Sequence, residues 1–113
     1  MSVNFYARAT GSPTIGPALA AALTADPEGL HVGQARAHCD FLMRAHPELG
    51  LTTMAAWRDL LAQPGITLWA ESGYQISVQE LLEEITDPRF RRFGWRTPDF
   101  RDDGVAFTAA AFQ

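Results

Sequence analysis

The chain of 113 residues is long enough for one domain with a single core and too short for two. Hydrophobic residues make up 47 % and charged residues 19 %, as in ordinary soluble proteins, and no apolar run approaches the roughly 20 residues of a membrane helix. The formal net charge is −4 and all nine basic residues are arginine, which argues against non-specific binding of duplex nucleic acid. The first residues lack the pattern of a signal peptide, so a cytoplasmic location is expected.

Two features of the composition bear on chemistry. Arginine binds phosphate or carboxylate bidentately, so the basic residues suit discrete anion recognition, although a GC-rich coding bias would give the same composition. Cys39 is the only cysteine, which excludes a disulfide framework and a cysteine-based zinc site. We interpret Cys39 as a small apolar residue of the core.

The N-terminal half predicts strands around one short helix. Aromatic residues and alternation over Val3–Ala9 predict a strand with Asn4, Tyr6 and Arg8 on one face. A Gly- and Pro-containing loop follows, and Pro17 begins a short Ala-rich helix, so we interpret residues 10–28 as an insertion. Residues 29–33, GLHVG, predict a short strand that leads to a turn.

Residues 37–46, AHCDFLMRAH, alternate with a period of two. This period places Phe41, Met43 and Ala45 on one face with Cys39, whereas a helical period scatters the polar residues. The opposite face then carries the polar side chains His38, Asp40, Arg44 and His46. The alternation favours a strand over a helix.

The C-terminal half predicts two helices and two strands. Thr52 or Thr53 caps a helix over 54–63, and Ser77 with Glu80 forms a capping box for a helix that ends before Asp87. Residues 66–71 predict a strand before a tight Ser-Gly turn, 89–104 are irregular, and 105–112 predict a closing strand after an Asp-Gly turn. The expected fold is therefore α+β: a single domain over 1–113, with an antiparallel sheet of about five strands and two to three short helices on one face.

An ordered set of short motifs covers most of the chain outside residues 10–28. They are FYAR, LHVG, the Trp and Leu of AAWRDLL, AESGYQISVQELLEEI and DDGVAFTAAAF. Together they resemble a small phage and prophage protein family that reads Y-x-R, L-H-[IV]-G, W-x-x-L, E-x-G-x-x-I-S-x-x-E and G-x-x-F. The resemblance implies a phage or mobile-element origin and brings no activity with it.

The chain departs from the family pattern at several positions. Gln34, Ala35 and Arg36 stand where the family has Lys-Ser-Ser, and the cysteine pair that many members carry near the N-terminus is absent. Ala70 and Tyr74 replace an Asp and an Arg of the second motif. If the Lys-Ser-Ser turn of the family grips an anion, the resemblance implies that Arg36 takes that role here or that the role is lost.

The first candidate site is a polar sheet face. Gly33 would allow a ligand to approach the backbone, Arg36 in the following turn would meet a phosphate, and histidine with Asp40 would hydrogen-bond a base or ribose. The ligand-binding residues expected on this face are Arg8, His31, Gly33, Arg36, His38, Asp40 and Arg44, with His46 beside them. The alternative is an ordinary solvated sheet face.

The same residues suggest a metal site only weakly. His38 and Asp40 share one strand face and His31 or His46 could complete three ligands, but no dedicated motif such as H-E-x-x-H is present. We therefore expect neither a metal nor a cofactor. No nucleophile motif is found, and we expect no enzymatic activity.

The second candidate site is the segment 89–96, RFRRFGWR, which interleaves arginines with aromatic residues. Such a segment can anchor a protein interface or stack bases, and we place the alternative partner surface on Arg92, Phe93, Trp95 and Arg96. Asp87, Asp99, Asp102 and Asp103 lie close in sequence and argue against nucleic acid here. In the third interpretation the aromatic rings fill the core.

The function expected from these features is an anti-defence protein, encoded by a phage and acting in the host cytoplasm, that sequesters a small anionic, nucleotide-type ligand. The first alternative is an inhibitor that binds a host protein through residues 89–96, in the manner of an anti-CRISPR protein. The second is a metal- or His-dependent phosphodiesterase that uses His31, His38 and Asp40. Pairing of edge strands between copies leaves a homo-oligomer open.

Overall fold

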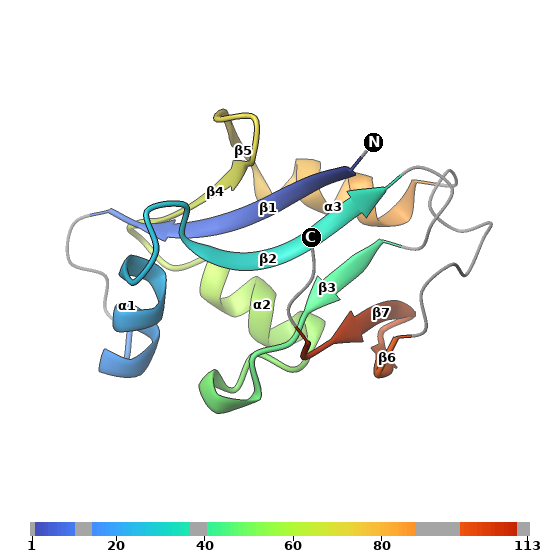
Figure 1. The fold of residues 1–113 in the computed structure, drawn as a ribbon, viewed down its shortest axis with the longest axis horizontal. Coiled ribbons are helices and arrows are strands. Elements are labelled where there is room, and N and C mark those ends of the chain that lie inside the picture. The colour runs from blue at the N-terminus through green and yellow to red at the C-terminus, as the bar shows by residue number, and fades with distance from the viewer. Residues whose placement is uncertain (1, 11–14, 37–40, 88–97, 111–113) are drawn as a thin grey trace.

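The computed structural model describes residues 2–10, 15–36, 41–87 and 98–110 and shows a seven-stranded mixed sheet with helices (Figure 1). The strand order is β5-β4-β1-β2-β3-β7-β6. In chain order the elements are β1 (Ser2–Ala9), α1 (Pro17–Thr24), β2 (Leu30–Arg36), β3 (Leu42–Arg44), the 3-10 turn η1 (Pro47–Leu49), α2 (Met54–Leu61), β4 (Ile66–Ala70), β5 (Gln75–Ile76), α3 (Val78–Thr86), β6 (Phe100–Asp102) and β7 (Val105–Thr108).

The α+β class is confirmed, and so are the three helices with their caps. Pro17 occupies the first turn of α1, Thr53 Oγ1 accepts from Ala56 N at the start of α2, and Ser77 with Glu80 forms the capping box of α3. The Ala-rich helix thus forms inside the segment 10–28, where its Leu23 enters the core.

The sheet differs from the expected one in strand number and in one pairing. β5 and β6 have two and three residues, too few for an alternation to show in the sequence, and they bring the strand number to seven. β3 and β7 pair in parallel, Leu42 with Ala106 and Arg44 with Thr108, whereas every other pair of named strands is antiparallel.

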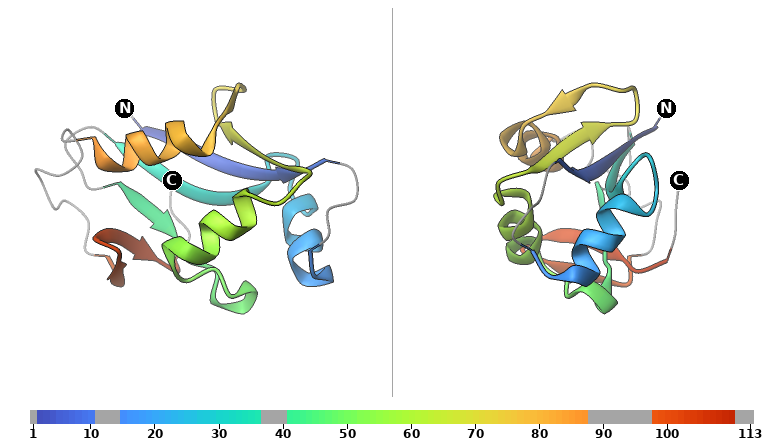
Figure 2. Two further views of the ribbon diagram at one scale, coloured as in Figure 1. Left: turned by 180° about the vertical axis from the view of Figure 1, so that it is seen from behind. Right: turned by 90° about the vertical axis from the view of Figure 1, so that its left-hand side faces the viewer.

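One face of the sheet forms the core. Figure 2 shows α2 and α3 on the same side of the sheet, which faces away from the viewer in Figure 1. Trp57 of α2 and Leu81 of α3 are each 1 % exposed. They belong to one apolar cluster with side chains from six strands, among them Phe5, Val32, Met43, Leu68, Ile76 and Phe107. Burial of this apolar area is the main stabilising term for the fold.

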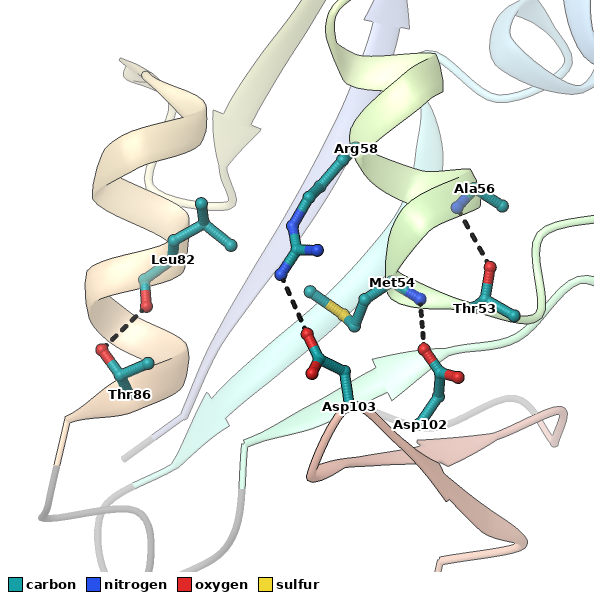
Figure 3. Close-up of polar contacts among 8 residues, drawn as sticks. All are labelled: Thr53, Met54, Ala56, Arg58, Leu82, Thr86, Asp102 and Asp103. Atoms are coloured by element: carbon teal, nitrogen blue, oxygen red, sulfur yellow. Dashed lines mark hydrogen bonds and ion pairs between the residues drawn. The ribbon is translucent and has the colours of Figure 1, made fainter.

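A hairpin of β6 and β7 is attached to α2 by two aspartates (Figure 3). Asp102 Oδ2 accepts a hydrogen bond of 2.8 Å from Met54 N, one of the backbone donors that the helix itself leaves without a partner. The next residue, Asp103, forms an exposed ion pair of 3.2 Å with Arg58. Asp103 lies in the left-handed region at φ 52°, and with Gly104 it forms the predicted Asp-Gly turn.

The two aspartates should differ in their contribution to stability. We expect Asp102→Ala to lower the free energy of unfolding by about 1–2 kcal/mol, because it removes a charged acceptor from a partly buried helix start. Asp103→Asn tolerates the same backbone conformation and removes only a surface ion pair, so we expect a loss of at most about 0.5 kcal/mol. Urea unfolding of both variants measures the difference, and equal losses would contradict a capping role for Asp102.

Candidate functional site

The face of the sheet opposite α2 and α3 carries a group of half-buried aromatic and basic side chains. We call it the outer face and define it by Tyr6, Arg8, His31, Arg44 and Trp69, which come from four neighbouring strands. Tyr6 pairs with Trp69 of β4 on one side and with His31 of β2 on the other. Arg44 of β3 follows the buried Met43, so it points away from the core.

The rings of the outer face lie close to one another and to an arginine. The ring centroids of Tyr6 and His31 are 5.3 Å apart, with their planes inclined by 32°. The guanidinium carbon of Arg8 lies 4.6 Å from the ring centroid of Trp69, a cation–π contact. Trp69 Nε1 donates to Thr67 Oγ1 at 2.9 Å, which fixes the indole beneath the arginine.

Both arginines of the outer face are held by their inner nitrogen. Arg8 Nε donates to the carbonyl oxygen of Glu28 at 2.9 Å, and Arg44 Nε donates to the carbonyl oxygen of Ala109 at 3.2 Å. Among the described residues the terminal Nη groups of these two side chains make no hydrogen bond. Each guanidinium is therefore fixed in place with its outer donors available to a ligand.

A polar network continues the outer face toward the N-terminal end of β1. Asn4 Oδ1 accepts from His31 Nε2 at 2.9 Å and from Gln34 Nε2 at 3.2 Å. The Glu71 carboxylate accepts from Asn4 N at 2.8 Å and from Asn4 Nδ2 at 3.4 Å. Gln34 is 1 % exposed, and its Oε1 has no partner among the described residues. A buried acceptor of this kind favours a donor group placed against it.

The protonation states of Tyr6 and His31 are set by their surroundings. Burial, and then a hydrogen bond to the Glu28 carboxylate, raise the pKa of Tyr6 to about 12, so Tyr6 is a neutral donor at physiological pH. Burial, followed by the positive charge of Arg44, lowers the pKa of His31 to about 4 against the opposing hydrogen bond to the Gly33 backbone. His31 is therefore a neutral imidazole at physiological pH, with one N–H for either Asn4 or the Gly33 backbone.

The predicted ligand-binding residues are found in three kinds of place. Arg8, His31 and Arg44 come together on the outer face, and Arg36 lies exposed at the end of β2 without an ion pair to the other described residues. Gly33 is buried inside the sheet. The remaining expected residues, His38 and Asp40, lie outside the described residues, as do Cys39 and the alternative partner residues Arg92, Phe93, Trp95 and Arg96.

The expectation of a turn after Gly33 is wrong, because β2 continues to Arg36 and pairs with both β1 and β3. A Cβ at position 33 would lie 2.7 Å from the carbonyl oxygen of Leu42 and 2.9 Å from Phe41 Cε1. The close approach that this glycine permits is thus made by the neighbouring strand and an aromatic ring of the protein itself.

His46 does not join the outer face, because the period of two ends with β3 at Arg44. Its ring is 6 % exposed, stands edge-on to Trp57 at a centroid distance of 5.9 Å, and donates from Nε2 to the carbonyl oxygen of His31 at 2.8 Å. This contact satisfies a β2 carbonyl beyond the point where the β2–β3 pairing ends. Burial is the first cause of the lowered pKa of His46.

The sequence reasoning overlooked Tyr6, Trp69, Asn4 and Gln34 as site residues. Tyr6 and Asn4 were placed on the same strand face as Arg8, which was the available signal. Trp69 and Gln34 have no local signal, because only the pairing of β4 and β2 with β1 brings them there.

No family model, curated protein or solved structure matches the chain. The resemblance to a phage protein family therefore stays a prediction. Within the described ranges, no three His, Cys, Asp or Glu side chains are grouped so as to hold a metal ion. None of the helices in the same ranges is long and apolar enough to cross a membrane.

Gly33→Ala tests the packing role of this glycine. We expect a loss of about 2–3 kcal/mol in the free energy of unfolding, because the new methyl group meets backbone and a buried ring. Gly16→Ala, where a Cβ meets nothing within 4 Å, is the matched control and should lose less than about 1 kcal/mol. Urea unfolding that leaves Gly33→Ala as stable as the control would contradict the packing role.

The lowered pKa of His31 predicts a loss of stability in acid. The folded state holds the neutral imidazole, so the unfolded state binds more protons between the unfolded value of 6.5 and the folded value of about 4. Stability is therefore highest above this window and falls as the pH drops through it. In His31→Gln the dependence should be shallower, since of the histidines that the structure describes His46 alone keeps a lowered pKa. Parallel profiles of unfolding free energy against pH for the two proteins would rule out this contribution of His31.

Proposed function

We propose that the outer face binds a small anionic, nucleotide-type ligand and holds it without chemical change. The observation that carries this proposal is the combination of paired Tyr6 and His31 rings with two guanidinium groups fixed through Nε. Aromatic rings offer a stacking surface to a base, and guanidinium donors bind phosphate oxygens.

Carboxylates near the outer face oppose an anion, so the arginine donors must outweigh them. Both Glu71 oxygens accept hydrogen bonds from Asn4, and the Glu28 carboxylate accepts from the Tyr6 hydroxyl. These hydrogen bonds leave each carboxylate with its charge, and the charges of Glu28, Glu71 and Asp26 all act on Tyr6. Arg8, Arg36 and Arg44 keep donors that the described residues do not use.

The proposed mode of action is sequestration. Neutral His31 and protonated Tyr6 are hydrogen-bond donors at neutral pH, and their partners Asn4 and Glu28 are acceptors and not nucleophiles. A protein that binds a nucleotide-type signal and leaves it intact lowers the free concentration of that signal. This action would suit an anti-defence protein of phage origin, the origin that the resemblance implies.

A thermal-unfolding panel tests the proposed function. The purified protein is heated with mononucleotides, cyclic nucleotides and ADP-ribose, and one class should raise the midpoint by roughly 10 °C at 100 times its Kd, where binding adds about 2.7 kcal/mol. Arg8→Gln and Arg44→Gln should each weaken binding about tenfold or more through lost charged hydrogen bonds.

Arg58→Gln is the control, because Arg58 pairs with Asp103 and lies on α2, on the side of the sheet opposite the outer face (Figure 2). It should bind as the wild type does. A panel without any shift, or full binding by both outer-face variants, would overturn the proposal.

A further inference from the structure

The guanidinium groups of the two outer-face arginines are fixed by different partners on opposite sides of the face. Arg8 and Arg44 stand on β1 and β3, with β2 between them. Two strand spacings of about 4.8 Å and roughly two residue rises of about 3.3 Å place their Cα atoms on the order of 12 Å apart. Arg8 is held over Trp69 of β4, and Arg44 is tied to Ala109 after β7, so neither guanidinium is directed at the other.

The space between the two arginines is occupied by the rings of Tyr6 and His31. These residues are cross-strand neighbours on β1 and β2, and both are half-buried. The order across the outer face is thus guanidinium over indole, phenol ring, imidazole ring and second guanidinium. A ligand that uses the whole face needs flat groups in the middle and negative charges at two separated points.

A short single strand of nucleic acid has this layout, because its phosphates repeat along the backbone while its bases are free to stack on protein rings. We propose that the ligand of the outer face is a single-stranded oligonucleotide of a few nucleotides that crosses β1, β2 and β3. This inference rests on the proposed function and narrows its ligand class. Paired bases in a duplex have no exposed faces for Tyr6 and His31, and the net charge of −4 gives little non-specific attraction.

The number of contacting arginines sets the expected salt dependence. Each neutralised phosphate of a single strand contributes about −0.7 to the slope of log K against log salt concentration. Arg8 and Arg44 together predict a slope of about −1.4, and participation of Arg36 raises its size to about −2. Such shallow slopes separate this site from an extended basic groove.

The test is a binding series with fluorescently labelled thymidine and adenosine oligomers of one, two, four and six nucleotides. We expect affinity to rise at least tenfold from the mononucleotide to the tetranucleotide and then to level off. Arg8→Gln and Arg44→Gln should each weaken tetranucleotide binding about tenfold and make the salt slope shallower by about 0.7, and Arg58→Gln should do neither. Circular dichroism of each variant confirms that it is folded.

The outcomes distinguish this inference from the proposed function. Mononucleotides that bind as tightly as tetranucleotides would overturn the oligonucleotide inference and leave the nucleotide proposal standing. Tighter binding of duplexes than of single strands would also overturn it. If no nucleotide or oligomer binds to folded protein, both proposals fail.

Discussion

The outer face depends on one irregularity in the pairing of β1 with β2. Phe5 pairs with Gly33 but the next residue, Tyr6, pairs with His31, so Val32 is an extra residue in β2. A bulge of this kind shifts the alternation of a strand by one residue. Val32 is buried in the core at 0 % exposure. His31 and Gln34 are three residues apart and would face opposite sides of a regular strand, yet both reach Asn4 on the outer side. Without the bulge, only one of them could do so.

Elements with local sequence signals could be predicted, whereas the bulged strand β2 could not. Helices α2 and α3 and their caps follow from local signals, because a hydroxyl cap and an apolar stripe are both written within a few residues. The regular alternation of β1 placed Asn4, Tyr6 and Arg8 correctly. The alternation of β2 cannot be followed past residue 31 from the sequence alone, since a bulge has no fixed sequence signature and the glycine beside it suggested a turn.

The other residues of the candidate site are placed by strand pairing between segments far apart in the sequence. Trp69 joins Arg8 only because β4 pairs with the free side of β1, and His46 leaves the polar face because β3 stops at Arg44. For Gly33, the sequence correctly predicted a close approach to the backbone but assigned it to a ligand. A glycine was needed there for close approach, but Leu42 and Phe41 supply the approaching atoms. From the sequence alone, the glycine indicates that another group approaches the backbone closely at position 33, but it does not identify that group.

The parallel pairing of β3 with β7 has a consequence for how the chain folds. β1, β2 and β4 are joined by contacts that form within the first 70 residues, whereas the free edge of β3 waits for residues 105–108. The separation of 64 residues between Leu42 and Ala106 is close to the 65 residues between Phe5 and Ala70, so the order of synthesis, and not loop length, makes this pairing late. During synthesis the Met43 side of β3 therefore stays uncovered until Phe107 arrives. The interval before that arrival is when the protein is most exposed to pairing with another chain.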